Sequence, residues 1–98
     1  MLRHIVLLTF KPDATEAEKT AVADALEGLR RIPEVRALVC GPNVGTAPNH
    51  SDFALVADFD DIDAFRRYLA SPPHRAYVEG PARVAVAKIA AMQHEWRQ

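Results

Sequence analysis

Two short segments carry apolar side chains on both of their faces, and this pattern limits the fold more than any other feature. Residues 4–10 (HIVLLTF) and 52–59 (DFALVADF) are rich in β-branched and aromatic residues, which is typical of strands. Alternation along the strands gives one face formed by His4, Val6, Leu8, Phe10, Phe53, Leu55, Ala57 and Phe59. The opposite face is formed mainly by Ile5, Leu7, Ala54 and Val56. A sheet built from these strands needs cover on both sides, because either face left in water would expose a contiguous apolar patch.

The residues between these two strands predict a helix and a further strand. Thr15 and Glu18 form a capping-box pattern, which marks the start of a helix. An apolar stripe at helical spacing follows, made of Val22, Leu26 and Leu29. We expect this helix to run to about Arg31 and to stop before Pro33. Residues 35–41 (VRALVCG) then predict a strand, followed by a loop rich in proline, glycine and asparagine.

A second helix is predicted after the strand at residues 52–59. Asp60 or Asp61 can cap it, and its apolar stripe is Ile62, Phe65, Tyr68 and Leu69. The pair Pro72 and Pro73 fixes two backbone angles and removes two donors, so this helix must end or kink by Ser71.

The double proline also allows a new short helix to begin at about Pro73. His74 and Tyr77 then lie near its start, one turn apart, and Tyr68 lies on the other side of the corner. Such a corner either serves packing alone or holds polar groups at the mouth of a pocket.

Residues 84–96 are ambiguous, because their alanines suit a helix while their alternating bulky residues suit a strand. With a strand there, the element order predicts a single α+β domain over residues 1–98, with a four-stranded antiparallel sheet and the helices on one face. The uncovered face is apolar, and sheet-to-sheet packing of two copies would cover it. We therefore expect a homodimer formed through the sheet face.

Composition excludes several classes of partner. The net charge is −1 and the charges are interspersed, which provides no surface for nucleic acid or for an anionic membrane.

Cys40 is the only cysteine, which excludes an intramolecular disulfide and fits a reducing compartment. The opening segment is too short to span a membrane, so we expect a cytoplasmic protein. No local metal-ligand motif and no haem ligand is evident, and neither metal nor cofactor is expected.

Three stretches together resemble the stress-responsive dimeric A/B barrel (Dabb) family. They are RHIVLLTFKPDAT (residues 3–15), FALVADFDDIDAFRRYLASPPH (residues 53–74) and QHEW (residues 93–96). The resemblance covers nearly the whole chain. It implies a ferredoxin-like βαββαβ protomer, a strand at residues 84–96, and a dimeric α+β barrel.

The family includes plant stress proteins, small bacterial members and a plant polyketide (olivetolic acid) cyclase. The resemblance to this cofactor-independent cyclase implies catalytic roles for His4, Tyr68 and His74. It also implies an apolar pocket formed by Val6, Leu8, Val22, Leu26, Leu55, Ala57, Ile62, Phe65 and Leu69. The chain departs from the cyclase at three positions, which hold Leu26, Phe53 and Ser71.

Each candidate residue also has a structural interpretation. His74 is either a general base or a histidine that ties the proline corner to the sheet. Tyr68 is either a substrate contact or a core aromatic residue, and His4 is either a polar pocket residue or a solvated strand-end histidine. Two functions follow. One is a cofactor-independent catalyst of aldol-type cyclisation or isomerisation on a small apolar carbonyl or polyketide-like compound, and the other is a non-catalytic dimeric stress or small-molecule-binding protein.

Overall fold

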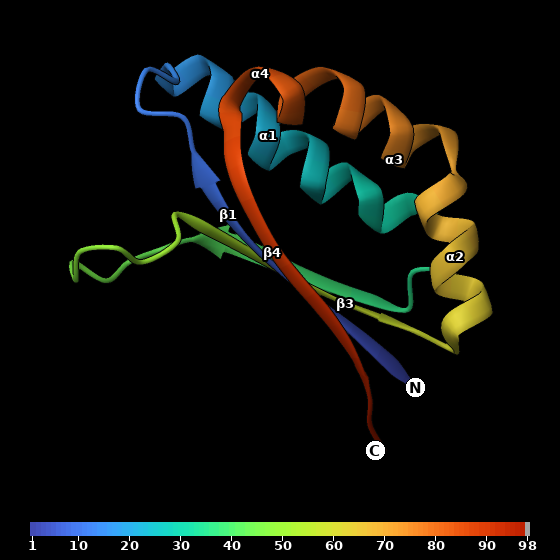
Figure 1. Cartoon of the computed structure of the whole chain (residues 1–98). Helices are drawn as coiled ribbons and strands as arrows, with labels where there is room; N and C mark the ends of the chain where they lie inside the picture. Colours follow the sequence, from blue (N-terminus) through green and yellow to red (C-terminus); the bar gives the residue numbers. More distant parts are fainter. Residues whose placement is uncertain (98) are drawn as a thin grey trace.

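The computed structural model describes residues 1–97, in which helices pack on one face of a four-stranded sheet (Figure 1). The strands are β1 (Leu2–Phe10), β2 (Ala37–Pro42), β3 (Phe53–Phe59) and β4 (Val86–Glu95). The helical elements are α1 (Glu16–Gly28), the 3₁₀ turn η1 (Leu29–Arg31), α2 (Ile62–Ala70), α3 (Pro72–Tyr77), the π-helical turn η2 (Val78–Ala82) and α4 (Arg83–Ala85). The strand order is β2-β3-β1-β4, and every pair is antiparallel. The predicted ferredoxin-like α+β fold is confirmed.

The start of α1 follows the sequence pattern closely. The Thr15 hydroxyl accepts a hydrogen bond from the Glu18 backbone N–H (3.1 Å), and the Glu18 carboxylate accepts one from the Thr15 N–H (2.8 Å). These reciprocal bonds satisfy two donors that the first turn would otherwise leave free. The far end differs slightly, because the α-helix stops at Gly28 and only the tighter turn η1 continues to Arg31.

Two other boundaries differ from expectation. The second strand starts at Ala37 instead of residue 35, because the Val35 N–H turns back to the Ile32 carbonyl (3.0 Å). The ambiguous segment begins as the helical turn α4, and only the residues from Val86 onward are a strand. There the pairing with β1 decides the conformation, which local propensity left open.

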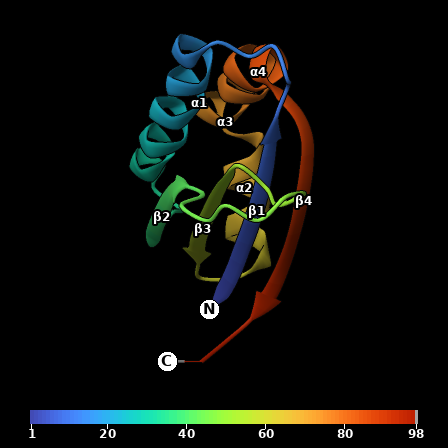
Figure 2. The same ribbon diagram turned by 90° about the vertical axis from the view of Figure 1, so that its left-hand side faces the viewer.

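The helix-covered face of the sheet holds the core. Its buried residues come from alternate positions of the strands, as predicted, and include Leu8, Leu38, Leu55, Ala57 and Phe59. The helices contribute Val22, Leu26, Phe65 and Tyr68. Figure 2 shows α1, α3 and α4 together at one end of this face and α2 near its other end.

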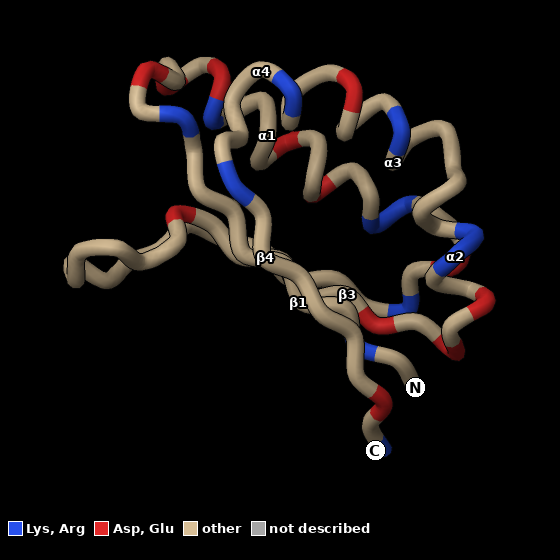
Figure 3. Tube along the Cα trace, in the orientation of Figure 1, with Lys and Arg blue, Asp and Glu red and all other residues tan. Residues whose placement is uncertain are grey.

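The opposite face of the sheet is apolar and uncovered in the protomer. Val39, Val56, Ile5 and Met92 pair in register and form one row across all four strands. The side chains at the ends of this row are well exposed, Val39 at 66% and Met92 at 54%. Charged residues lie mostly on the helices, the loops and the strand ends, so the middle of the sheet is nearly free of them (Figure 3).

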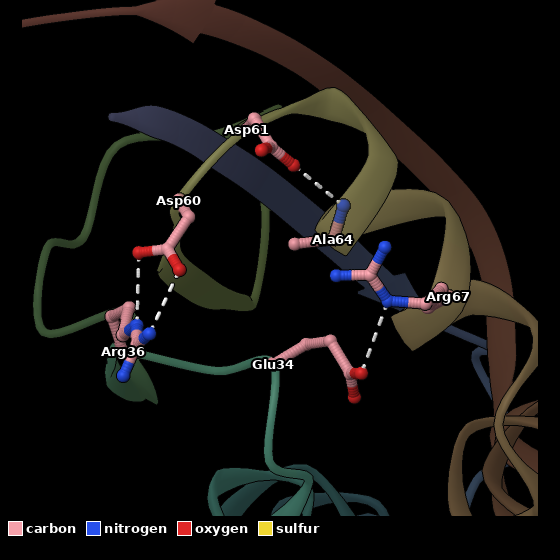
Figure 4. A network of polar contacts seen from close by, with 6 residues as sticks. All are labelled: Glu34, Arg36, Asp60, Asp61, Ala64 and Arg67. Carbon is pink, nitrogen blue, oxygen red and sulfur yellow. Dashed lines mark hydrogen bonds and ion pairs between the residues drawn. The ribbon is translucent and has the colours of Figure 1, made fainter.

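Polar contacts fix α2 beside the sheet (Figure 4). Asp61, and not Asp60, is the helix cap, because its carboxylate accepts a hydrogen bond from the backbone N–H three residues further on (2.8 Å). Asp60 instead makes two bonds to the Arg36 guanidinium (2.9 and 2.8 Å). Arg67 of α2 reaches Glu34 (3.2 Å). These contacts hold the helix that carries Tyr68.

In residues 1–97, no helix has the length and apolar character needed to cross a membrane.

Candidate functional site

The double-proline corner joins α2 and α3 through one extended residue. Ser71 has φ −68° and ψ 148°, and its hydroxyl donates a hydrogen bond to the Tyr68 carbonyl (2.7 Å). The chain can therefore leave α2 at Ala70 and start α3 at Pro72 without an intervening loop. The corner places the rings of Tyr68 and His74 with their centroids 4.9 Å apart.

His4 reaches the same place from the middle of the sheet. It lies on the helix-covered face of β1 and is only 6% exposed. Its ring centroid is 4.7 Å from that of Phe65 and 6.3 Å from that of Tyr68. Gln93 pairs with His4 across β1 and β4, and its amide nitrogen lies 3.0 Å from His4 Nδ1. When the Gln93 amide donates to Nδ1, the neutral His4 ring carries its own proton on Nε2.

These polar residues line one cavity of about 180 Å³ between the sheet and the helices. His4, Tyr68 and His74 all contribute to its wall, as do five of the predicted apolar residues: Val6, Leu8, Leu26, Leu55 and Leu69. The most exposed of the lining residues are Leu69, Val78, Ile89 and Ala91. The mouth therefore lies between β4 and the helical segment that includes the end of α2 and the start of η2.

Four predicted pocket residues do not line the cavity. Val22 and Ala57 are fully buried in the core. Phe65 stands behind the cavity and packs against His4, which it holds in place. Ile62 is 40% exposed, because it lies in the first turn of α2, away from the corner.

The structure adds lining residues that the sequence interpretation missed. They are Leu29, Tyr77, Val78, Ile89 and Ala91. Tyr77 had a signal in the sequence, since it lies one helical turn after His74 and is aromatic; the two ring centroids are 6.3 Å apart. Ile89 and Ala91 depended on the segment whose secondary structure was ambiguous.

Burial sets the charge state of the polar groups. It lowers the pKa of His4 from 6.5 to about 4, with a smaller contribution from His74 and an opposing one from the Met92 backbone. Burial likewise lowers the pKa of His74, against a weaker opposing effect of the Leu69 backbone. Both imidazoles are therefore neutral near pH 7. Burial raises the pKa of Tyr68 and of Tyr77, so both hydroxyls stay protonated and can donate hydrogen bonds.

The chemistry of the cavity is that of neutral donors and acceptors. No aspartate, glutamate, lysine or arginine is among its lining residues. Within residues 1–97, no three His, Cys, Asp or Glu side chains come together as a metal site would require. The cavity thus combines two neutral imidazoles and two tyrosines with apolar walls.

A wider hollow of about 460 Å³ lies at the end of β2 and the start of β3, beside residues 43–51. It includes His50 and the outer-face residues Leu7 and Ala54. His50 is exposed there and has no second titratable side chain beside it in the lining. The smaller cavity is the better candidate site, because buried polar groups from three separate elements converge on it.

Comparison with known proteins finds relatives that match this chain over most of its length. An uncharacterised protein of Streptomyces coelicolor is 34% identical over 82 residues, covering 80% of this chain and 84% of that protein. A dimeric ferredoxin-like protein of unknown function from Thermobifida fusca is 34% identical, with a TM-score of 0.86 over 97% of this chain and 90% of that one. A hydroxynitrile lyase from Passiflora edulis has a TM-score of 0.82 over 95% of this chain and 90% of that one, at 19% identity, which shows a shared fold.

Residues 2–94 match the family described as the Stress responsive A/B Barrel Domain. The match extends from the first strand to the last, and it includes the three elements that carry His4, Tyr68 and His74. The chain belongs to the stress-responsive A/B barrel (Dabb) family.

Proposed function

We propose that this protein is a cofactor-independent acid/base catalyst acting on a small neutral carbonyl compound. The observation that carries the proposal is the convergence of His4, Tyr68 and His74 on one apolar cavity. The reaction class is an aldol-type cyclisation or a related isomerisation, both of which begin with removal of a proton next to a carbonyl group.

His74 is the base in this mechanism. Its ring is neutral near pH 7, so it can accept a proton from the carbon next to the carbonyl. The electron pair of the broken C–H bond moves into an enolate. In the cyclisation the enolate carbon attacks a second carbonyl carbon of the same molecule, and the alkoxide oxygen formed there takes the proton back from His74. In the isomerisation a conjugated enolate takes that proton from His74 at another of its carbons.

Tyr68 and His4 stabilise the enolate oxygen. The Tyr68 hydroxyl and the His4 Nε2–H are both neutral donors, and the charge that they stabilise develops only during the reaction. Apolar walls keep water away and strengthen these hydrogen bonds. Gln93 is the positioning residue, because its bond to Nδ1 selects the tautomer with the proton on Nε2.

The volume of the cavity limits the size of the substrate. An engineered apolar cavity of about 150 Å³ binds benzene. A cavity of about 180 Å³ is therefore suited to a ligand somewhat larger than benzene. The absence of charged lining residues favours a neutral ligand, since a buried charge without a partner is costly.

We also propose that the protein is a homodimer formed through the outer face of the sheet. The apolar row from Val39 to Met92 supports this, because such a row is costly to leave in water. Several relatives of the same fold are described as dimeric, among them proteins from Thermobifida fusca and Bacteroides fragilis.

Hydrogen–deuterium exchange tests the catalytic step without knowledge of the substrate. A panel of small neutral ketones and aldehydes, including acetophenone, is incubated with the protein in D₂O, and loss of the protons next to the carbonyl is followed by NMR. We expect wild-type protein to accelerate exchange and His74→Ala to lose about 100-fold or more of that acceleration. Arg75→Ala is the matched control, because Arg75 is the next residue of α3 and is exposed.

The alternative function is a non-catalytic binding protein. It would bind members of the panel saturably and cause no exchange. Thermal unfolding at matched protein concentration tests a third possibility, that His74 has a structural role. If His74→Ala loses several degrees of melting temperature, His74 is a structural residue of the corner and the catalytic role is refuted.

A further inference from the structure

Two neighbouring hollows of the molecule share two lining side chains, those of Leu29 and Tyr77. The first is the cavity of about 180 Å³ that contains His4 and His74. The second is a groove of about 250 Å³ between α1 and α3, which includes Ala25, Gly28, Pro73 and Pro81. Leu29 and Tyr77 line both of them. These two residues therefore form the wall between the cavity and the groove.

Both wall residues are well packed although each borders two hollows. Leu29 is 2% exposed and Tyr77 is 7% exposed. Leu29 belongs to the core cluster, where its truncation would leave a cavity. Tyr77 ends α3, and its ring is the larger of the two side chains, so it closes most of the wall.

The backbone next to Tyr77 is irregular. The α-helix gives way there to the π-helical turn η2. Pro81 explains the change, because a proline has no N–H for the carbonyl four residues earlier, which is that of Tyr77. π-helical turns are frequent at functional sites. In this chain the turn lets Val78 line the cavity while Pro81 lines the groove.

The groove could accept the same kind of ligand as the cavity. Its lining contains no charged residue, and Tyr77 supplies its main polar group. An apolar chain that passed the wall would meet alanine, glycine and proline surface on the other side.

We propose that Tyr77 determines specificity by limiting the length of the ligand. It closes the side of the cavity that faces the groove, so that a short neutral ligand fits and a longer one is rejected. With a small side chain at position 77, the cavity and the groove join, and an apolar tail can extend between α1 and α3. The inference rests on the proposed function only in taking the cavity as the ligand site.

Two probes of different length test this role. Acetophenone is the short probe and 4-pentylacetophenone is the long one, and their dissociation constants are measured by NMR titration of the backbone amides. We expect wild-type protein to favour the short probe. Tyr77→Ala should bind the long probe about tenfold or more tightly than wild type, while the constant for the short probe changes much less.

Tyr77→Phe is the matched control, because it keeps the ring and removes only the hydroxyl. It should retain the wild-type preference for the short probe. If Tyr77→Ala does not fold, Tyr77→Leu opens the wall more gently and should shift the preference in the same direction. An unchanged preference in a folded Ala or Leu variant overturns the inference, and so does failure of wild type to bind acetophenone.

The same probes separate this inference from the proposed function. If the preference shifts but wild type does not accelerate proton exchange, the catalytic proposal fails and the role of Tyr77 stands. If exchange is accelerated and depends on His74 but the preference is unchanged, the role of Tyr77 fails and the catalytic proposal stands.

Discussion

Acid should destabilise this protein through His4, and the size of the effect can be worked out from the structure. In the folded protein the His4 ring takes up a proton only at about pH 4, because burial disfavours the charged form, whereas its ordinary pKa is 6.5. Between these values the unfolded chain binds more protons than the folded protein. The free energy of unfolding therefore falls as the pH falls from about 6.5 to about 4.

Each pH unit between the two pKa values corresponds to about 1.4 kcal/mol. His4 should therefore remove roughly 3 kcal/mol of stability across this range. The groups around the ring give no compensating negative charge. Gln93, Phe65 and Tyr68 are neutral neighbours, and His74 opposes protonation of His4.

The assay is urea unfolding of wild type and His4→Gln at about pH 7 and about pH 4.5, at matched protein concentration. The variant has no titratable group at position 4, so its loss of stability on acidification should be smaller by about 2 to 3 kcal/mol. Carboxylates such as Asp58 titrate in both proteins and cancel in this difference. His50→Gln is the control, because it removes an exposed loop histidine and should keep the wild-type loss. Equal losses in wild type and His4→Gln would refute the assignment of His4 as a buried neutral group.

Two further predictions concern the fold and its assembly. Val39→Asp places a charge in the apolar row of the sheet face and should weaken the dimer by about 2–5 kcal/mol, seen as a lower mass in sedimentation, whereas Val44→Asp in the exposed loop should not. A dimeric mass for Val39→Asp at low protein concentration would contradict dimerisation through this face. Thr15→Ala removes one half of the capping box and should lower the free energy of unfolding by about 1 kcal/mol in urea, while Thr15→Ser should not. An unchanged urea midpoint for Thr15→Ala would mean that the cap contributes nothing measurable.

Local signals in the sequence were sufficient for most of the fold. The structure confirms the capping box, the helix ends before prolines and the strands with apolar residues on both faces. Each of these features depends only on residues close together in the sequence. The segment that starts at residue 84 was different, because its alternation is weak. Its path is determined by pairing with β1 and by the bond from the Lys11 N–H to the Ala85 carbonyl (2.8 Å), which a local pattern does not contain.

The candidate site was predictable in its polar residues and less so in its walls. His4, Tyr68 and His74 came from the family resemblance, and the structure brings all three to one cavity. The walls depend on how the helices lie on the sheet. Ile62 shares the apolar stripe of Tyr68 but lies two turns away from the corner, and Ile89 faces the cavity only because of the register between β1 and β4.

The cavity is itself an argument for function in a chain of this size. A closed and dry volume of about 180 Å³ would cost about 4 kcal/mol, and the open mouth of this cavity reduces that cost. A larger residue at Ala91 or Val78 could fill part of this space, and both positions have exposed surface at the mouth. Natural proteins commonly keep such destabilising features where activity needs them. The proposed role in binding or proton transfer would account for the two imidazoles that this space holds in the neutral form.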